Sequence, residues 1–440
     1  AQKEGYYFDK KQGIHYFGPG YYKLSEMFSN GTLSVNKKKV IYLAGGAVLD
    51  GQLGFNQSSS AEIRGRGMIM NKEEKGMDNR VVLSVSASTG GTIEGIIIHG
   101  HRAPGWVCTN DKSSGLSYRN VKIISTRYAS TDGIDINQCT DFTFENMFIR
   151  SCDDAVAIKG LDAETSAPVD CRPNKNLLFE KMQLWNDCNN AFGMGAETRA
   201  SLYENISLRN SDILFSYDDP NYHETLDERS AMNICALHGT YFRNIVFENI
   251  RVNRCERLIG LGFKDNFWFG SIQGDQSYPG GIDGVIFRNI ICESNSKIAN
   301  DIWLYGWYKE GTPTKQVKNI TFDNVIIEGN LLQNDQSIKT NNVSGIILVK
   351  DLFFNTGLDV TEVREKYAVK VYPTILNQGE NIYLEGDPIL KCSAYSSLGQ
   401  LLGDYSGKCI ISTAEWPSGI NFIKILDGRL SSQVTAIIVR

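Results

Sequence analysis

Phe144-Glu145-Asn146-Met147-Phe148-Ile149 is one copy of a short phrase that recurs through the middle of the chain. Each copy has an aromatic residue, a variable residue and an asparagine, and then apolar residues at alternate positions. Alternation with a period of two is typical of β-strands, and recurrence along a chain is typical of solenoids. Further copies begin at Tyr118, Tyr203, Phe247, Phe287 and Phe322, with an imperfect copy at Phe179.

The repeats predict an all-β fold, a right-handed parallel β-helix. The copies around Asn120, Asn146 and Asn205 fit a solenoid period, and loop insertions explain the longer intervals. An asparagine stacked on the asparagine of the next coil is expected to form a ladder of side-chain amides at tight turns. A β-propeller is the alternative, but its blades need four strands per repeat and a longer, more regular period.

The flanking segments set the expected domain boundaries. Residues 1–80 predict a cap and the first coils, and residues 81–350 predict the β-helix itself. Residues 351–368 break the pattern and are interpreted as a linker. Residues 369–440 alternate differently, with turn residues between short apolar runs, which predicts a small antiparallel β-sandwich.

Composition limits the class of protein. The 440 residues have a net charge of −5, which argues against nucleic acid as a partner. No apolar run is long enough to span a membrane. No signal peptide is visible, and a start at Ala1 suits a chain whose leader was removed or is not included. The ten cysteines have no zinc-site spacing, so we interpret most as core thiols, with room for a chance disulfide, and predict no metal and no cofactor.

Two acidic stretches lie inside the repeats: Ser130-Thr-Asp-Gly-Ile-Asp135 and Cys152-Asp-Asp-Ala-Val-Ala-Ile-Lys159. Aligning the apolar residues of the two stretches, Ile134 with Val156, gives an offset of 22 (156 − 134), which places Asp132 beside Asp154. Neighbouring strands lie about 4.8 Å apart, so these carboxylates are expected to be close, with Asp153 one residue away. The same alignment adds Asn190 to the column in the next coil.

Such a cluster suits acid/base hydrolysis of a glycosidic bond. Carboxylates that repel one another raise the pKa of at least one member, as a general acid requires. Inverting glycosidases use one carboxyl group to protonate the leaving oxygen and another to activate water. An outward aspartate can simply solvate a turn, but three acids at one corner of two consecutive coils favour catalysis.

The chain is similar to the β-helix glycoside hydrolases of the polygalacturonase family (family 28) and the dextranase/isopullulanase family (family 49). The resemblance covers roughly residues 15–330, and the specific matches are Thr131-Asp132-Gly133 and Asp153-Asp154. It implies an inverting enzyme with Asp153 as general acid and with Asp132 and Asp154 activating water. The phrases at 16–22 and 41–47 look more like the dextranase side.

The departures from polygalacturonases concern the substrate. Their Gly-His-Gly is replaced by Asn189-Asn190-Ala191, and their Arg-Ile-Lys, which reads a uronate carboxylate, is compared with the strand Arg257–Lys264. A neutral, dextran-like α-glucan is therefore favoured over galacturonan, which stays as the alternative. A pectate-lyase reading ranks lower because it requires Ca²⁺ and a basic catalyst. The residues expected to bind substrate are Asp135, Lys159, Asn190, Glu197, His101, Trp106, His223 and Lys264.

A hypothesis of another class is a catalytically silent β-helix that binds glycans, which would not need all three acids. The C-terminal module resembles the sorting domain of secreted Bacteroidetes proteins, in Val371-Tyr-Pro373 and Trp416-Pro-Ser-Gly419. That resemblance implies export, and a carbohydrate-binding sandwich is the alternative. The expected partner is a polysaccharide or oligosaccharide, and the chain is expected to be a monomer that is secreted, periplasmic or on the cell surface.

Overall fold

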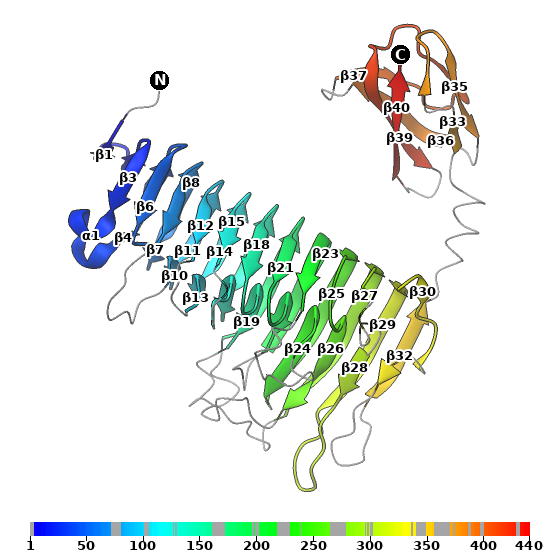
Figure 1. The fold of residues 1–440 in the computed structure, drawn as a ribbon. Helices are drawn as coiled ribbons and strands as arrows, with labels where there is room; N and C mark the ends of the chain where they lie inside the picture. Colours follow the sequence, from blue (N-terminus) through cyan, green and yellow to red (C-terminus); the bar gives the residue numbers. More distant parts are fainter. Residues whose placement is uncertain are drawn as a thin grey trace. The chain divides into compact units, whose positions relative to one another are not determined.

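The structure is a computed structural model, and the chain divides into two compact units, Ala1–Thr356 and Gly357–Arg440 (Figure 1). The described residues are 4–71, 81–100, 105–125, 127, 130–160, 172–195, 198, 202–217, 229–237, 239–264, 279–294, 296, 299, 302–335, 338–339, 349–355, 370–372, 375–385, 389–396, 400–427 and 432–440. No helix among these residues is long and apolar enough to cross a membrane.

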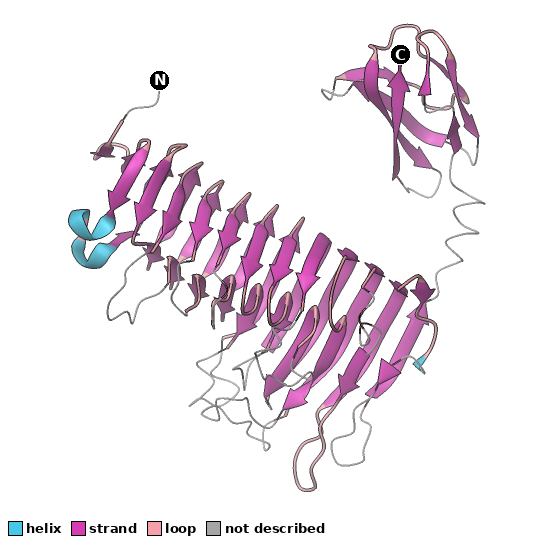
Figure 2. Ribbon diagram, in the orientation of Figure 1, coloured by secondary structure: helices cyan, strands magenta, loops and turns pink. Residues whose placement is uncertain are grey.

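The first unit is a right-handed parallel β-helix, as predicted, and Figure 2 shows it to be built almost entirely of strands. One of its two sheets has eleven strands, and each pairs in parallel with the corresponding strand of the next coil. In order these are β4 (Thr32–Val35), β7 (Gln52–Asn56), β10 (Leu83–Ser86), β13 (Cys108–Asp111), β16 (Ile134–Asn137), β19 (Val156–Lys159), β22 (Phe192–Met194), β24 (Met232–Leu237), β26 (Ile259–Lys264), β28 (Ile302–Tyr305) and β31 (Ile338–Lys339).

The larger sheet has 21 strands and forms the other walls of the coils. The early coils contribute β1 (Tyr6–Asp9), β2 (Ile14–Phe17), β3 (Gly20–Lys23), β5 (Val40–Leu43), β6 (Ala47–Asp50), β8 (Ser59–Gly65), β9 (Met68–Met70), β11 (Thr89–Glu94), β12 (Ile97–His99), β14 (Ser114–Arg119) and β15 (Lys122–Ile124). The later coils contribute β17 (Thr140–Glu145), β18 (Phe148–Ser151), β20 (Asn174–Glu180), β21 (Gln183–Asn186), β23 (Leu202–Ser216), β25 (Tyr241–Val252), β27 (Gly281–Cys292), β29 (Gln316–Ile327), β30 (Asn330–Leu331) and β32 (Val349–Asn355).

The first unit begins with a short helical segment beside its first strands and ends with the strand β32. At the N-terminal end, the short helix α1 (Leu24–Met27) and the 3₁₀ turn Ser29–Gly31 lie beside the first strands (Figure 1). At the other end β32 pairs in parallel with β29, so the coils continue to Asn355, past the expected start of a linker at residue 351.

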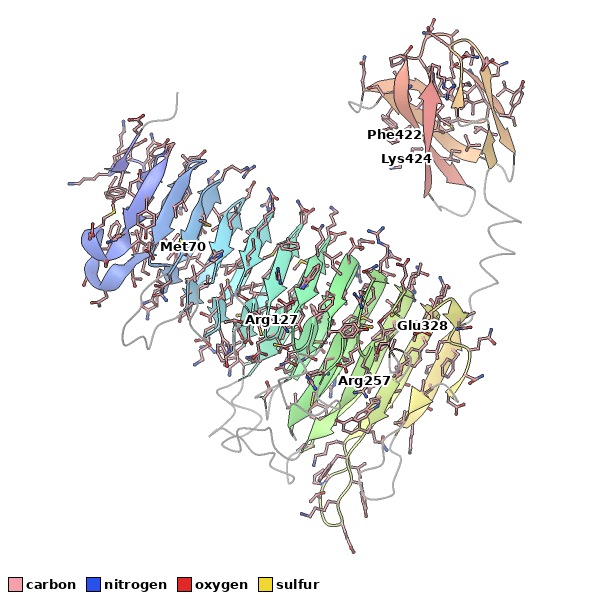
Figure 3. All side chains as sticks on the ribbon, in the orientation of Figure 1. Met70, Arg127, Arg257, Glu328, Phe422 and Lys424 are labelled. Atoms are coloured by element: carbon pink, nitrogen blue, oxygen red, sulfur yellow. The ribbon has the colours of Figure 1, made fainter. Side chains whose placement is uncertain are left out.

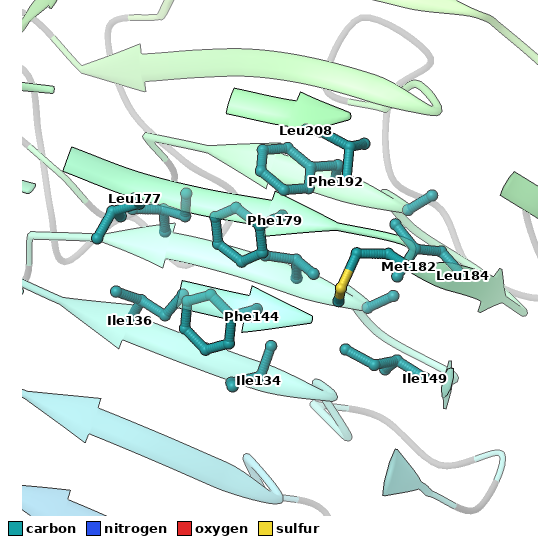
Figure 4. Close-up of a cluster of buried hydrophobic side chains, with 14 of the residues drawn as sticks. Ile134, Ile136, Phe144, Ile149, Leu177, Phe179, Met182, Leu184, Phe192 and Leu208 are labelled. Atoms are coloured by element: carbon teal, nitrogen blue, oxygen red, sulfur yellow. The ribbon is translucent and has the colours of Figure 1, made fainter. Parts of the chain in front are cut away.

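Alternating side chains of the strands fill one continuous core. Ile134 and Ile136 of β16 point inward beside Phe144, and Phe144 stacks on Phe179 of the next coil with ring centroids 4.5 Å apart (Figure 4). Stacking of equivalent residues follows from parallel pairing in register, because each strand places the same position over its neighbour. The aromatic position of the repeated phrase is therefore the core position of the solenoid.

The predicted amide ladder is confirmed. The Nδ2 groups of Asn249, Asn289 and Asn324 each donate to the Oδ1 of the preceding ladder residue at 2.9 Å. The ladder asparagines have φ values near +50°, a conformation that asparagine tolerates better than most residues. The amides therefore satisfy one another at the turn that the phrase encodes.

One copy of the phrase was assigned to the wrong column. Asn205 lies in a second ladder, in which it donates to Asn176 at 3.0 Å and accepts from Asn244 at 3.3 Å. The residue of that coil in the main column is Asn210, which accepts from Asn249. β23 runs through both corners without a break, and the aromatic residue Tyr203 precedes Asn205 whereas Leu208 precedes Asn210, so the phrase matched the wrong corner.

The second unit is described by itself. It has a three-stranded antiparallel sheet and a five-stranded, largely antiparallel sheet around a separate core that includes Trp416 and Ile423. The strands are β33 (Lys370–Tyr372), β34 (Ile375–Leu376), β35 (Asn381–Glu385), β36 (Ile389–Ser396), β37 (Leu401–Asp404), β38 (Ile410–Ser412), β39 (Gly419–Asp427) and β40 (Ser432–Val439).

Candidate active site

Asp132 and Asp154 lie just before β16 and β19, where consecutive coils enter the eleven-stranded sheet. Ile134 of β16 pairs with Val156 of β19, which confirms the predicted offset and places Asp132 beside Asp154. Backbone hydrogen bonds link these neighbouring coils: Gly133 N donates to Asp154 O at 2.8 Å, and Ala155 N donates to Asn190 O at 2.9 Å. Asp132, Asp154 and Asn190 therefore form one row across three coils.

Asp132, Asp153 and Asp154 form a compact cluster, with one carboxylate oxygen of each within 4.8 Å of the others. The side chains of Asp132 and Asp154 are buried, with 2% and 4% of their surface exposed, whereas Asp153 is half-buried. Gly193 keeps the adjacent position small, because a Cβ there would lie 3.2 Å from Asp154 Oδ2. Of the three acids, Asp153 is the one that meets solvent.

Asn190 holds the Asp154 carboxylate. The backbone N–H and the Nδ2 group of Asn190 donate to Asp154 Oδ1 at 3.0 and 2.9 Å. Ser230 N donates to Asn190 Oδ1 at 2.9 Å, which fixes the amide orientation. Burial raises the pKa of Asp154 well above its ordinary value, and the negative charges of Asp153 and Asp132 raise this pKa further.

The raised pKa of Asp154 predicts a pH-dependent cost to the fold. An unfolded aspartate titrates near pH 4, so above that pH the folded protein binds a proton that the unfolded chain has released. The contribution of Asp154 to stability is therefore greatest below about pH 4 and is lost as pH rises through its folded pKa.

We expect Asp154→Asn to unfold at a higher temperature than wild type at pH 7, and its stability to vary less between pH 4 and pH 8. Thermal unfolding followed by circular dichroism across that range measures both effects. Asp135 keeps its own raised pKa, so some pH dependence remains. A variant that is less stable than wild type at every pH would contradict this electrostatic assignment.

Three donors surround the Asp153 carboxylate. Ser130 N donates to Oδ2 at 3.1 Å, and Asn189 Nδ2 and Asp154 N donate to Oδ1 at 2.8 and 3.0 Å. Asn186 also donates through Nδ2 to the backbone oxygen of Asp153. Asp153 is therefore fixed by the coils on both sides of it.

Lys159 joins two buried carboxylates. Its Nζ lies 3.0 Å from Asp132 Oδ2 and 3.1 Å from Asp135 Oδ1, and Lys159 and Asp135 are 3% and 0% exposed. The Trp106 ring covers the ammonium, with Nζ 3.9 Å from the ring centroid. Burial, followed by the charge of Asp132, raises the pKa of Asp135 well above its ordinary value.

The residues expected to bind substrate lie in different surroundings. Asp135 and Lys159 are buried against other protein groups, and Lys159 contacts the Asp132 carboxylate. Trp106 lies beside this pair, and Asn190 contacts Asp154. His101, Glu197 and His223 lie outside the described residues, and only the backbone of Lys264 is described, at the end of β26.

One contact of the cluster and strand β24 were not identified from the sequence. Asn189 was noted only as part of a replaced motif, although adding 36 residues to Asp153 (the offset from Asp154 to Asn190) gives its position. The strand that follows β22 is β24, and Met232 of β24 pairs with Phe192. Arg257, labelled in Figure 3, precedes β26, the strand after β24, and its guanidinium lies 3.8 Å from the centroid of the Trp303 ring.

The chemistry of the cluster suits proton transfer. Three neighbouring carboxylates can also hold a cation, but here an ammonium and side-chain amides occupy oxygens of all three. Burial raises the pKa values of Asp154 and Asp135, and the half-buried Asp153 provides a surface at which a proton can be exchanged with a bound molecule.

Comparison with known proteins gives one family match. Residues 12–175 match the family described as glycosyl hydrolases family 28, and no curated protein matches the chain. Among solved structures, the polygalacturonase of Erwinia carotovora ssp. carotovora is 13% identical over 75% of this chain and 87% of its own, with a TM-score of 0.49. The family 28 exopolygalacturonase of Yersinia enterocolitica is 13% identical over 77% and 71%, with a TM-score of 0.48.

The exopolygalacturonase of Thermotoga maritima is 15% identical over 76% of this chain and 86% of its own, with a TM-score of 0.44. Identities this low say nothing about the substrate. The matched segment 12–175 contains Asp132, Asp153 and Asp154, that is, all three acids of the cluster. Residues 12–175 of this β-helix chain are therefore similar to glycosyl hydrolases family 28.

Proposed function

We propose that the protein hydrolyses glycosidic bonds of a polysaccharide or oligosaccharide by acid/base catalysis at Asp132, Asp153 and Asp154. The observation that carries this proposal is the cluster itself: three carboxylates within 4.8 Å at one corner of the β-helix, inside the segment that matches family 28. Repelling buried acids destabilise a fold, and catalysis explains why a protein keeps them, whereas glycan binding alone does not require them.

Asp153 is the proposed general acid. A general acid must come within hydrogen-bond distance of the glycosidic oxygen, and Asp153 is the member of the cluster that meets solvent. Asp132 is the proposed base for water, because the Lys159 ammonium at 3.0 Å stabilises its ionised form. Asp154, fixed by Asn190, completes the pair that activates water and helps keep a proton in the cluster.

Inversion at the anomeric carbon is the proposed stereochemical outcome, on the resemblance to families 28 and 49. The carboxylate oxygens here approach more closely than the roughly 6.5–9.5 Å typical of inverting enzymes, so the product is the decisive observation. We expect proton NMR of the first product from an α-linked substrate to show the β-anomer before mutarotation. An initial α-anomer would replace inversion with a retaining mechanism.

A neutral sugar is the proposed substrate at the reacting position. The ammonium of Lys159 already faces Asp132 and Asp135, so it is not placed to bind a substrate carboxylate. The next coil after Asn190 contributes Ser230 and Asn233, which are neutral, and the cation beside them, Arg229, is only 6% exposed. Galacturonan remains the alternative, because residues 12–175 match family 28, the family of the polygalacturonases that the sequence resembles.

A reducing-sugar assay separates these substrates. We expect release of reducing ends from an α-glucan such as dextran, with a lower kcat/KM on polygalacturonate. The opposite preference would establish the galacturonan alternative. Binding of glycans without hydrolysis of any polymer in a panel of α-glucans, pectic polymers and host-type glycans would establish the non-catalytic alternative.

The protein is proposed to act outside the cytoplasm, since polysaccharides are met there. The resemblance of residues 371–419 to a sorting domain supports export, and the C-terminal unit is a separate β-rich module with its own core. Comparing the mass of the protein recovered from the culture medium with that of the full chain tests whether this module is cleaved on export.

A further inference from the structure

Two buried thiols lie directly beside the turns that carry the acid cluster and its amide donors. Cys152 immediately precedes Asp153, and Cys188 immediately precedes Asn189. The two cysteines are 1% and 3% exposed, and their Sγ atoms are 2.7 Å apart. A second pair in the same β-helix, Cys255 and Cys292, has its Sγ atoms 3.6 Å apart and gives an internal comparison.

The register of the coils explains why Cys152 and Cys188 meet. The offset from Asp154 to Asn190 is 36 residues (190 − 154), and the offset from Cys152 to Cys188 is the same (188 − 152). The strands before them pair with an offset of 35 (186 − 151), Ser151 with Asn186, so the later coil holds one more residue at this corner, and Cys188 meets Cys152 there. Neighbouring coils lie about 4.8 Å apart, a spacing that a disulfide can bridge.

We propose that Cys152 and Cys188 form a disulfide bond that ties the turn of Asp153 and Asp154 to the turn of Asn189 and Asn190. The Sγ atoms need to approach by only about 0.7 Å to reach the disulfide bond length of about 2.05 Å. The thiols of Cys255 and Cys292 are further apart and stay reduced.

The oxidant is a disulfide compound, either a small molecule such as glutathione disulfide or a protein dithiol oxidase. One cysteine attacks it to give a mixed disulfide, and the other cysteine displaces the second thiol. The two protein thiols lose two electrons and two protons in total, and the oxidant is reduced to two thiols. Both sulfur atoms are buried in the folded chain, so the bond forms during folding.

The bond acts on the site through the two asparagines. Asn189 donates to Asp153 at 2.8 Å, and Asn190 donates to Asp154 at 2.9 Å, so a covalent link between the turns keeps both donors on their carboxylates. Cys152 and Cys188 are therefore positioning residues. Without the bond, weaker donation from Asn190 would raise the pKa of Asp154 further, because hydrogen bonds to a carboxylate favour its ionised form.

Peptide mapping tests the bond directly. The full chain, folded in the presence of glutathione disulfide, is denatured, alkylated with iodoacetamide without reductant, digested and analysed by mass spectrometry. We expect one cross-linked peptide containing Cys152 and Cys188, which separates on reduction, and alkylated Cys255 and Cys292. Alkylation of both Cys152 and Cys188, or a bond from either to another cysteine, would overturn the proposal.

Kinetics test the positioning role, and this arm rests on the proposed hydrolase function. Cys152→Ser, Cys188→Ser and the double variant are expected to lower kcat several-fold and equally, to leave KM nearly unchanged, and to move the pH profile to higher pH. Cys255→Ser is the matched control and keeps the wild-type profile. Additive losses in the double variant, or an unchanged pH profile, would refute the positioning role. If wild type hydrolyses no glycan, the peptide map still decides the disulfide.

Discussion

Asp153→Asn is expected to reduce kcat for glycoside hydrolysis by about 10²–10⁴-fold, the usual contribution of a positioned general acid. The asparagine keeps an oxygen that can accept from Asp154 N and Asn189 Nδ2 and fills nearly the same volume, so of the three hydrogen bonds only the one from Ser130 N is lost. KM is expected to change little, because the proton is needed only as the glycosidic bond breaks. Steady-state kinetics on the polymer identified by the reducing-sugar assay measure the loss.

Asp141→Asn is the matched control for this prediction. Asp141 is an exposed residue of β17 that accepts from Asn176 through Oδ1, and it has a φ of +60°, which asparagine accepts as readily as aspartate. The control should retain wild-type kcat and should unfold at the wild-type temperature. Asp153→Asn with wild-type activity would remove Asp153 from the role of acid, and the same test would then pass to Asp154.

The fold could be predicted from the sequence because a solenoid states its structure many times. Phe144 and Phe179 show the inward position, and Asn249, Asn289 and Asn324 show the turn, so one misread copy does not change the architecture. Asn205 was misread because the phrase is local, whereas the column of a residue depends on how many residues fill each preceding corner.

The acid row could also be predicted, because Asp132 and Asp154 are fixed by the same alternation that fixes the neighbouring core residues Ile134 and Val156. The environment of Lys159 could not. Its burial depends on Trp106 from a different coil and on two carboxylates 27 and 24 residues away in sequence (159 − 132 and 159 − 135). From the sequence alone, a lysine at the end of a strand is expected to be exposed to solvent.

Lys159→Met is expected to be the most destabilising of the substitutions considered, by about 3–5 kcal/mol, because it removes the cation from a buried ion pair and leaves the carboxylates uncompensated. Counting every acid as ionised, the four aspartates 132, 135, 153 and 154 with Lys159 have a net charge of −3 (−4 + 1), which becomes −4 in the variant. Denaturant unfolding followed by circular dichroism measures the loss. Lys175→Met is the control, since the Lys175–Glu204 ion pair is on the surface, where such pairs contribute about 0–1 kcal/mol.

The double variant Lys159→Met/Asp135→Asn separates charge balance from packing. It returns the cluster to a net charge of −3 (−3 + 0), so we expect it to recover much of the stability lost in Lys159→Met. Catalysis should not recover to the same extent, because Asp132 still lacks the ammonium at 3.0 Å that keeps it ionised. The acidic limb of the kcat/KM profile should therefore lie at higher pH in both variants than in wild type. A double variant no more stable than Lys159→Met would mean that the lysine stabilises the coils by packing. If the acidic limb of the kcat/KM profile lies at the same pH in the variants as in wild type, Asp132 is not the base.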